Sequence, residues 1–159
     1  MKIMLGTPIT GIVEPYGNSK GISFSSRESI IQIINDIREE GHEVFCALEL
    51  EDFGNVEVNN IECTVRDFTI MKDCDLYVVF PNNSYGCAVE LGWASALSIP
   101  IFMLVNTKFN FKTPLYEGLI GIHENTKYFE YDSFYDFPTT DNWTTAFEEL
   151  KRFMQTIVL

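Results

Sequence analysis

Positive charge is scarce in this sequence. Its 159 residues include 11 Lys and Arg against 23 Asp and Glu, which gives a formal net charge of −12. Because a field of this sign repels a polyanionic backbone, DNA and RNA are excluded as expected partners. A small anion can still bind, since the backbone amides at the start of a helix act locally even in an acidic protein.

Long apolar runs and closely paired cysteines are also missing. The amino-terminal run Met1–Leu5 is interrupted at Gly6, too early for the apolar core of a signal peptide, and no run approaches the length of a membrane span. We therefore expect a cytoplasmic protein without a membrane partner. No C-x-x-C pair occurs, and three of the four cysteines lie inside apolar runs. This pattern favours reduced, buried thiols at Cys46, Cys63, Cys74 and Cys87.

Histidine is rare, which bears on metal binding. His42 and His123 are far apart in the sequence, and neither has a partner at metal-ligand spacing. We expect both to be exposed loop residues. The sequence therefore predicts neither a metal ion nor a cofactor.

The rest of the composition is that of an ordinary globular protein. Hydrophobic residues make up 46% and charged residues 21%, far from the balance of disordered or fibrous chains. The length suits one domain with its own core. Since no internal repeat divides the chain, we expect a single domain over residues 1–159.

Short apolar segments alternate with segments of helical periodicity. We predict strands at residues 2–5, 43–48, 76–80, 101–105 and 128–131. We predict one helix that begins near Ser26 and three more over residues 61–72, 87–97 and 143–157. The run at 76–80, Leu-Tyr-Val-Val-Phe, is typical of a sheet covered on both faces. The alternation predicts an α/β fold of the flavodoxin or Rossmann type. Its five-stranded parallel sheet would have the order 2-1-3-4-5 and helices on both faces.

The predicted strand order also predicts where a ligand binds. In open parallel sheets, ligands lie beyond the carboxyl ends of the strands at the point where the strand order reverses. Residues 6–11, 49–54 and 81–90 follow the first three strands and should meet there. The acidic run within 49–54 is most simply a solvated loop, although one carboxylate could bind a ribose hydroxyl or a base amine.

One of these segments combines a helix start suited to anions with an acid inside the helix. Ser84 can cap the helix or offer its hydroxyl to a phosphate, and Gly86 lets the backbone come close. Near the positive end of the helix dipole, Glu90 would stay ionised, as a nucleophile must. The alternative is a capping serine and a surface glutamate. Against this, the apolar neighbours Val89 and Leu91 make an acid without a function unexpected.

Two stretches carry a resemblance to a known family. Residues 73–81, Asp-Cys-Asp-Leu-Tyr-Val-Val-Phe-Pro, lead into residues 84–95, and Gly6-Thr7-Pro8 is followed by Val13-Glu14-Pro15. Over about residues 2–105 the sequence resembles the nucleoside 2-deoxyribosyltransferase superfamily, whose members place a catalytic glutamate in a helix after the third strand. It is most similar to the nucleoside 5′-monophosphate N-glycosidases, the CMP and hydroxymethyl-CMP hydrolases of mildiomycin- and bacimethrin-type pathways.

The resemblance implies a function and roles for individual residues. It implies hydrolysis of the N-glycosidic bond of a pyrimidine nucleoside 5′-monophosphate, to free base and sugar 5-phosphate. Glu90 would attack C1′ of the sugar, and Asp67 and Asp75 would position the sugar or the nucleophile. Ser84 would contact the 5′-phosphate, and Thr7 stands where related phosphate-specific enzymes have a small hydroxyl residue. The family also implies no cofactor and a homodimer or higher homo-oligomer, with sites near the subunit interface.

Several alternatives stay open at the level of sequence. Asp75 can be a turn residue before a strand, and Asp67 a solvated helix position. In the first loop Gly6, Ile9 and Tyr16 are the candidates to meet the substrate, where the CMP hydrolases carry an aromatic residue and an arginine. This difference predicts looser base selection. A 2′-deoxyribosyltransferase, or a non-catalytic module that binds a nucleotide or an NAD-derived signal, are the alternative functions.

Overall fold

A computed structural model describes residues 1–9, 22–108 and 113–157 of the chain. The strands are β1 (Lys2–Gly6), β2 (Glu43–Cys46), β3 (Leu76–Val79), β4 (Ile101–Asn106) and β5 (Thr126–Tyr131). The helices are α1 (Phe24–Glu39), α2 (Ala47–Leu50), the 3-10 turn η1 (Asp52–Gly54), α3 (Asn60–Asp73), α4 (Tyr85–Ala96), α5 (Pro114–Ile122) and α6 (Thr140–Met154). None of the helices within the described ranges is both long and apolar enough to cross a membrane.

The five strands form one parallel sheet in the order β2-β1-β3-β4-β5. The predicted fold class and strand order are therefore confirmed. Side chains alternate between the two faces of each strand, because successive residues of a strand point in opposite directions. In β3, Leu76 and Val78 belong to one apolar layer, and Tyr77 and Val79 to the other.

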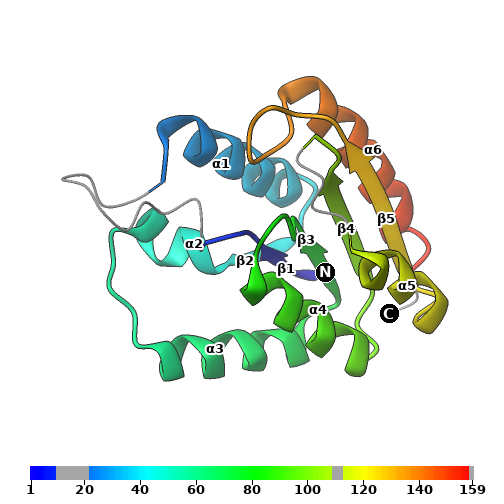
Figure 1. Cartoon of the computed structure of the whole chain (residues 1–159), viewed down its shortest axis with the longest axis horizontal. Coiled ribbons are helices and arrows are strands. Elements are labelled where there is room, and N and C mark those ends of the chain that lie inside the picture. Colours follow the sequence, from blue (N-terminus) through cyan, green and yellow to red (C-terminus); the bar gives the residue numbers. More distant parts are fainter. Residues whose placement is uncertain (10–21, 109–112, 158–159) are drawn as a thin grey trace.

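The two apolar layers are covered by different helices. The layer with Leu76 and Val78 is closed by Ile30 and Ile34 of α1 and by residues of α6. The layer with Tyr77 is closed by residues of α3, α4 and α5. Figure 1 shows α1 and α6 toward the top of the sheet, and α3 and α4 toward the bottom. Covering on both faces explains why β3 and β4 are fully buried.

Helix starts lie earlier in the chain than the sequence predicted. The first helix begins at Phe24 rather than near Ser26, because the Ser23 hydroxyl caps it by accepting from the Ser26 amide at 3.2 Å. The last helix begins at Thr140, three residues before the predicted start, and ends at Met154. Periodicity marks the first buried apolar residue, whereas the cap that starts the helix precedes it.

Two other predictions need correction. The second strand ends at Cys46, and the next four residues form the helix α2, in which Leu48 is buried. Helix α5 was not predicted, because its apolar residues are interrupted by Gly118 and Gly121 and show no clear helical period. Its start is nevertheless marked by Pro114 in the first turn, after the cap Thr113.

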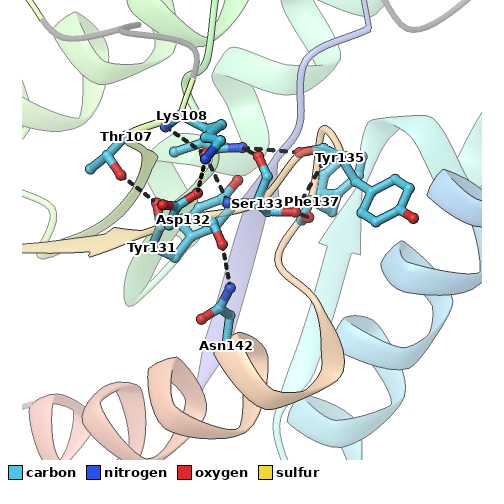
Figure 2. Close-up of polar contacts among 9 residues, drawn as sticks. Thr107, Lys108, Tyr131, Asp132, Ser133, Tyr135, Phe137 and Asn142 are labelled. Carbon is cyan, nitrogen blue, oxygen red and sulfur yellow. Dashed lines mark hydrogen bonds and ion pairs between the residues drawn. The ribbon is translucent and has the colours of Figure 1, made fainter.

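A buried asparagine fixes the chain between β5 and α6. Asn106 ends β4, and its amide nitrogen donates to the carbonyl oxygens of Ser133 and Tyr135, each at 2.9 Å. Its amide oxygen accepts from the backbone nitrogens of Lys108 and Ser133. Figure 2 shows this cluster, together with Asn142 of α6, which donates to the same loop. The loop after β5 is thus held against the carboxyl end of β4.

Candidate active site

Helix α4 is the element that follows β3, and it begins at the edge of the sheet where a ligand is expected. Ser84 is its N-cap, and the Ser84 hydroxyl accepts from the Cys87 amide at 3.2 Å. The amides of Tyr85 and Gly86 lie in the first turn, where a helix has no preceding carbonyl to pair with. Glu90 follows on the second turn of the same helix.

A cavity of about 520 Å³ lies next to this helix. Its walls come from the ends of the first three strands, as the sequence predicted, and from α3. The loop after β1 contributes Thr7 and Ile9; the segment after α2 contributes Glu51. The remaining walls are formed by residues of α3, α4 and the segment before α3: Val58, Asn60, Cys63, Thr64, Asp67, Ser84, Gly86, Cys87, Val89, Glu90 and Trp93.

Glu90 has a direct partner inside the protein. The hydroxyl of Tyr77, in the middle of β3, donates to Oε2 of Glu90 at 2.5 Å. Tyr77 is fully buried, whereas the Glu90 carboxyl reaches the cavity wall. The carboxylate is therefore anchored at one oxygen from within the core.

The pKa of Glu90 is raised from 4.5 to about 7. Burial is the largest cause, and the negative charge of Asp67 adds to it, while the hydrogen bond from Tyr77 acts in the opposite direction. The expectation of a carboxylate kept ionised by the helix dipole needs correction. The dipole acts mainly within the first turn, and Glu90 is the sixth residue of α4.

Two further carboxylates of the cavity share one cation. Arg66 of α3 contacts Oε1 of Glu51 through Nη2 and Oδ1 of Asp67 through Nε, both at 2.8 Å. The Glu51 and Asp67 side chains are only 8% and 15% exposed, so these pairs are weakly screened by solvent. Within the described ranges, Glu90 has no cation of its own. Its negative charge is therefore opposed by burial and by Asp67 without compensation from an ion pair.

Most of the residues predicted for the site line the cavity. Thr7, Ile9 and Gly86 lie in its wall with Ser84 and Glu90. Asp67 lies there too, in the same cavity wall as Glu90. Tyr16 lies outside the described residues.

Gly6 and Asp75 are placed elsewhere. Asp75 lies at the amino end of β3, where its Oδ2 accepts from the Lys2 amide at 2.7 Å and its own amide donates to the Lys2 carbonyl. This is the edge of the sheet opposite the cavity, so Asp75 lies away from the other residues predicted for the site. Gly6 is not in the cavity wall; a Cβ on it would lie 2.1 Å from the Tyr77 hydroxyl oxygen.

Sequence reasoning overlooked three residues of this site. Tyr77 was read only as part of an apolar strand, although a hydroxyl in a fully buried run needs a hydrogen-bond partner. Trp93 follows Glu90 by three residues and so shares its helix face, a spacing that could have indicated it. Arg66 gives no sequence signal, because its two partners come from different segments of the chain.

The histidines and cysteines take no part in a recognisable cluster. Both histidines are half-buried rather than exposed, and Nδ1 of His42 lies 3.4 Å from the amino-terminal nitrogen. All four thiols are free; Cys63 is half-buried and the other three are buried. Across the residues that the structure describes, no group of three His, Cys, Asp or Glu side chains could hold a metal ion.

No family model and no curated protein matches the sequence. Solved structures do. The CMP N-glycosidase BcmB of Clostridium botulinum shares 22% identity with a TM-score of 0.65, over 96% of this chain and 99% of its own. BlsM shares 28% identity with a TM-score of 0.67, over 83% of this chain and 81% of its own. A conserved protein from Enterococcus faecalis V583 shares 16% identity with a TM-score of 0.58, over 95% and 98%. BcmB and the Enterococcus protein share the fold of this chain, and the similarity to BlsM supports the family resemblance seen in the sequence.

Replacing Glu90 by Gln should stabilise the fold above pH 7 and change little near pH 4.5. A carboxyl whose folded pKa is raised binds its proton more tightly in the folded than in the unfolded chain. Its ionisation therefore costs stability progressively from pH 4.5 to about 7, and the full cost is present above that range. The glutamine oxygen can still accept from Tyr77 without a charge. We expect a gain of about 1–3 kcal/mol near pH 8, measured by urea unfolding.

The pH dependence of the stability gain tests whether the ionisation of Glu90 is its source. A gain of the same size near pH 4.5 and near pH 8 would show that the ionisation of Glu90 is not its source.

Proposed function

We propose that this chain is a nucleotide N-glycosidase, which cleaves a nucleoside 5′-monophosphate into free base and sugar 5-phosphate. The observation that carries the proposal is Glu90, a carboxyl with a pKa of about 7 in the wall of a cavity at the switch point of the sheet. Perturbed carboxyls in such a place are typical of catalytic groups. The fold shared with the CMP N-glycosidase BcmB and the similarity to BlsM support it.

The proposed reaction has two steps. The ionised carboxylate of Glu90 attacks C1′, and the bond from C1′ to the base nitrogen breaks with its electron pair on the base, which takes up a proton. Water then attacks C1′ of the glycosyl ester, loses a proton and releases the carboxylate. We assign the holding of this water to Asp67, because it lines the same cavity and lies close enough for its charge to raise the pKa of Glu90.

The phosphate is proposed to bind at the start of α4. Arg66 is already paired with Glu51 and Asp67, so its charge is not free for a second anion. We propose the amides of the first turn, with Ser84 and Gly86 in the cavity wall, as the donors to the phosphate, because the start of a helix favours an anion. We place the 5′-phosphate there and the sugar beside Glu90.

The base is proposed to lie against the apolar part of the cavity. Ile9, Val58 and Trp93 offer apolar surface to the face of a flat ring. A pyrimidine is our first choice, because BcmB is a CMP N-glycosidase. Thr7 lines the same cavity, and we propose that it contacts the sugar phosphate or the base.

Incubation with a panel of nucleosides, nucleoside monophosphates and NAD should release free base from a pyrimidine monophosphate. Glu90→Gln should lower kcat at least about a thousandfold while substrate binding survives, because the amide cannot form the ester. Chromatography of the free base measures turnover, and calorimetry measures binding. A second free base added to the reaction should not appear in a new nucleotide; if it does, the chain is a deoxyribosyltransferase. Binding of a nucleotide without base release from any substrate would favour the sensing module.

Ser84→Ala should weaken a monophosphate substrate by about 1–3 kcal/mol and leave the matching nucleoside nearly unchanged. Loss of the helix cap also costs about 1 kcal/mol of stability. Ser84→Thr keeps the hydroxyl and is the matched control, with both substrates close to the parent values. kcat/KM for nucleotide and nucleoside measures the difference. Equal loss for the two substrates would mean that Ser84 only caps the helix.

We also propose that the chain forms a homodimer through the face of α3, α4 and α5. Eight large apolar side chains are exposed on these helices: Ile61, Val65, Phe68, Tyr85, Val89, Leu115, Ile120 and Ile122. On α1 and α6 only Phe24 is comparably exposed. An apolar hollow of about 650 Å³ lies between α4 and α5 on the same face. Such a patch is typical of an interaction surface, and it would bring the cavity next to the interface.

Sedimentation should find a particle of twice the 18.2 kDa chain mass. Val65→Glu combined with Leu115→Glu should raise the dimer dissociation constant at least about tenfold, because each charge would be buried without a partner. Phe24→Glu, on the opposite side of the sheet, should leave the dimer intact. A parent protein that sediments as a monomer, or a dimer that only Phe24→Glu disrupts, would contradict this interface.

A further inference from the structure

The hydroxyl of Tyr77 serves no purpose in packing. Tyr77 is fully buried in β3, and its strand neighbours Leu76, Val78 and Val79 are aliphatic. A phenylalanine would fill the same space, whereas a buried hydroxyl is costly unless it is hydrogen bonded. The partner that it has is Oε2 of Glu90, at 2.5 Å. The polar atom of Tyr77 is therefore directed at the proposed nucleophile.

The neighbouring strand leaves room for this hydroxyl. Met4 of β1 pairs with Tyr77, and Gly6 lies two residues further along β1. A Cβ on Gly6 would lie 2.1 Å from the hydroxyl oxygen of Tyr77 and 2.7 Å from its Cζ. The backbone of Gly6 is not in the left-handed region, so the position requires glycine for space and not for its conformation. Any larger residue would displace the tyrosine from Glu90.

Resting on the proposed function, we propose that Tyr77 is a positioning residue for Glu90. Gly6 provides the space that the Tyr77 hydroxyl needs to reach Glu90. The Tyr77 hydroxyl holds Oε2, which leaves Oε1 as the oxygen that attacks C1′. When the glycosyl ester is later hydrolysed, the same hydroxyl receives the carboxylate that is released. Tyr77 itself transfers no proton in either step.

Burial and the charged groups around Tyr77 keep its hydroxyl protonated, so that it acts as a hydrogen-bond donor. Burial, with Glu90 next to it, raises the pKa of Tyr77 well above 10. The other titratable groups that face this pair are Asp67 from α3, Cys87 from α4 and Cys74 before β3. Each disfavours an additional negative charge on the pair. The hydrogen bond from Tyr77 is the contact that favours the ionised form of Glu90.

Tyr77→Phe removes the hydroxyl and keeps the ring. The carboxyl carbon of Glu90, followed by NMR in ¹³C-glutamate protein and assigned by its absence in Glu90→Gln, should titrate about one pH unit higher than in the parent. The acidic limb of kcat/KM should move by the same amount. At a pH below the limb kcat should fall about tenfold, with KM nearly unchanged. Tyr131→Phe is the matched control, because this buried tyrosine lies in the other layer and donates to the Asp136 carbonyl. This variant should leave the Glu90 titration and kcat unchanged.

The NMR titration needs no substrate, so it separates this inference from the proposed function. If Glu90 titrates at the same pH in Tyr77→Phe as in the parent, the positioning role is overturned, whether or not base is released. If the titration shifts but no base is released from any substrate, the contact stands and the proposed function fails. In the parent protein, the ζ-carbon of Tyr77 should itself follow the titration of Glu90. The absence of that response would overturn the inference even if Tyr77→Phe did not fold.

Discussion

The parallel pairing of β1 with β3 is the interaction on which the site depends. It sets Met4 beside Tyr77 and Gly6 beside Val79, and the Phe80 amide extends it by donating to the Gly6 carbonyl at 2.9 Å. Because the strands run in the same direction, their carboxyl ends open at one edge, where the first loop meets the start of α4. The same register presses the Tyr77 ring against a residue without a side chain. A shift of one residue would turn Tyr77 to the other layer and away from α4.

The electrostatics of the cavity follow from three carboxyls and one cation. Arg66 forms ion pairs with Glu51 and Asp67 but not with Glu90. Burial is therefore the largest influence on the pKa of Glu90. A carboxyl in this situation keeps its proton to higher pH, since a buried charge without a partner is costly. The hydrogen bond from Tyr77 limits the rise. The pKa of Glu90 is thus set mainly by burial, and the hydrogen bond from Tyr77 and the charge of Asp67 act on it in opposite directions.

The sequence predicted what local patterns encode. Alternation of strands and helices gave the sheet and its order, and the spacing of Ser84 and Glu90 placed a capped helix and an acid at the right edge. Asp75 was misplaced because a residue before a strand lies at the opposite edge from one after it, and the motif block does not distinguish the two ends. Gly6 was predicted to contact the ligand, whereas it lies outside the cavity wall and next to the Tyr77 side chain of another strand. Such contacts depend on register, which one sequence does not reveal.

Helix α4 also limits the kind of substrate that fits the proposed function. Glu90 in the second turn lies four positions after Gly86 in the first, a rise of about 6 Å along the axis. In a nucleoside monophosphate, O5′, C5′, C4′ and O4′ separate the phosphorus from C1′, so one helix can hold the phosphate at its start and C1′ beside Glu90. The three carboxyls in the cavity wall disfavour a dianion beside them, whereas the first-turn amides of α4 favour one. Under the proposed function, a phosphate held at this position would set which carbon of the sugar meets Glu90. A nucleoside lacks this constraint and would lose orientation more than contact area.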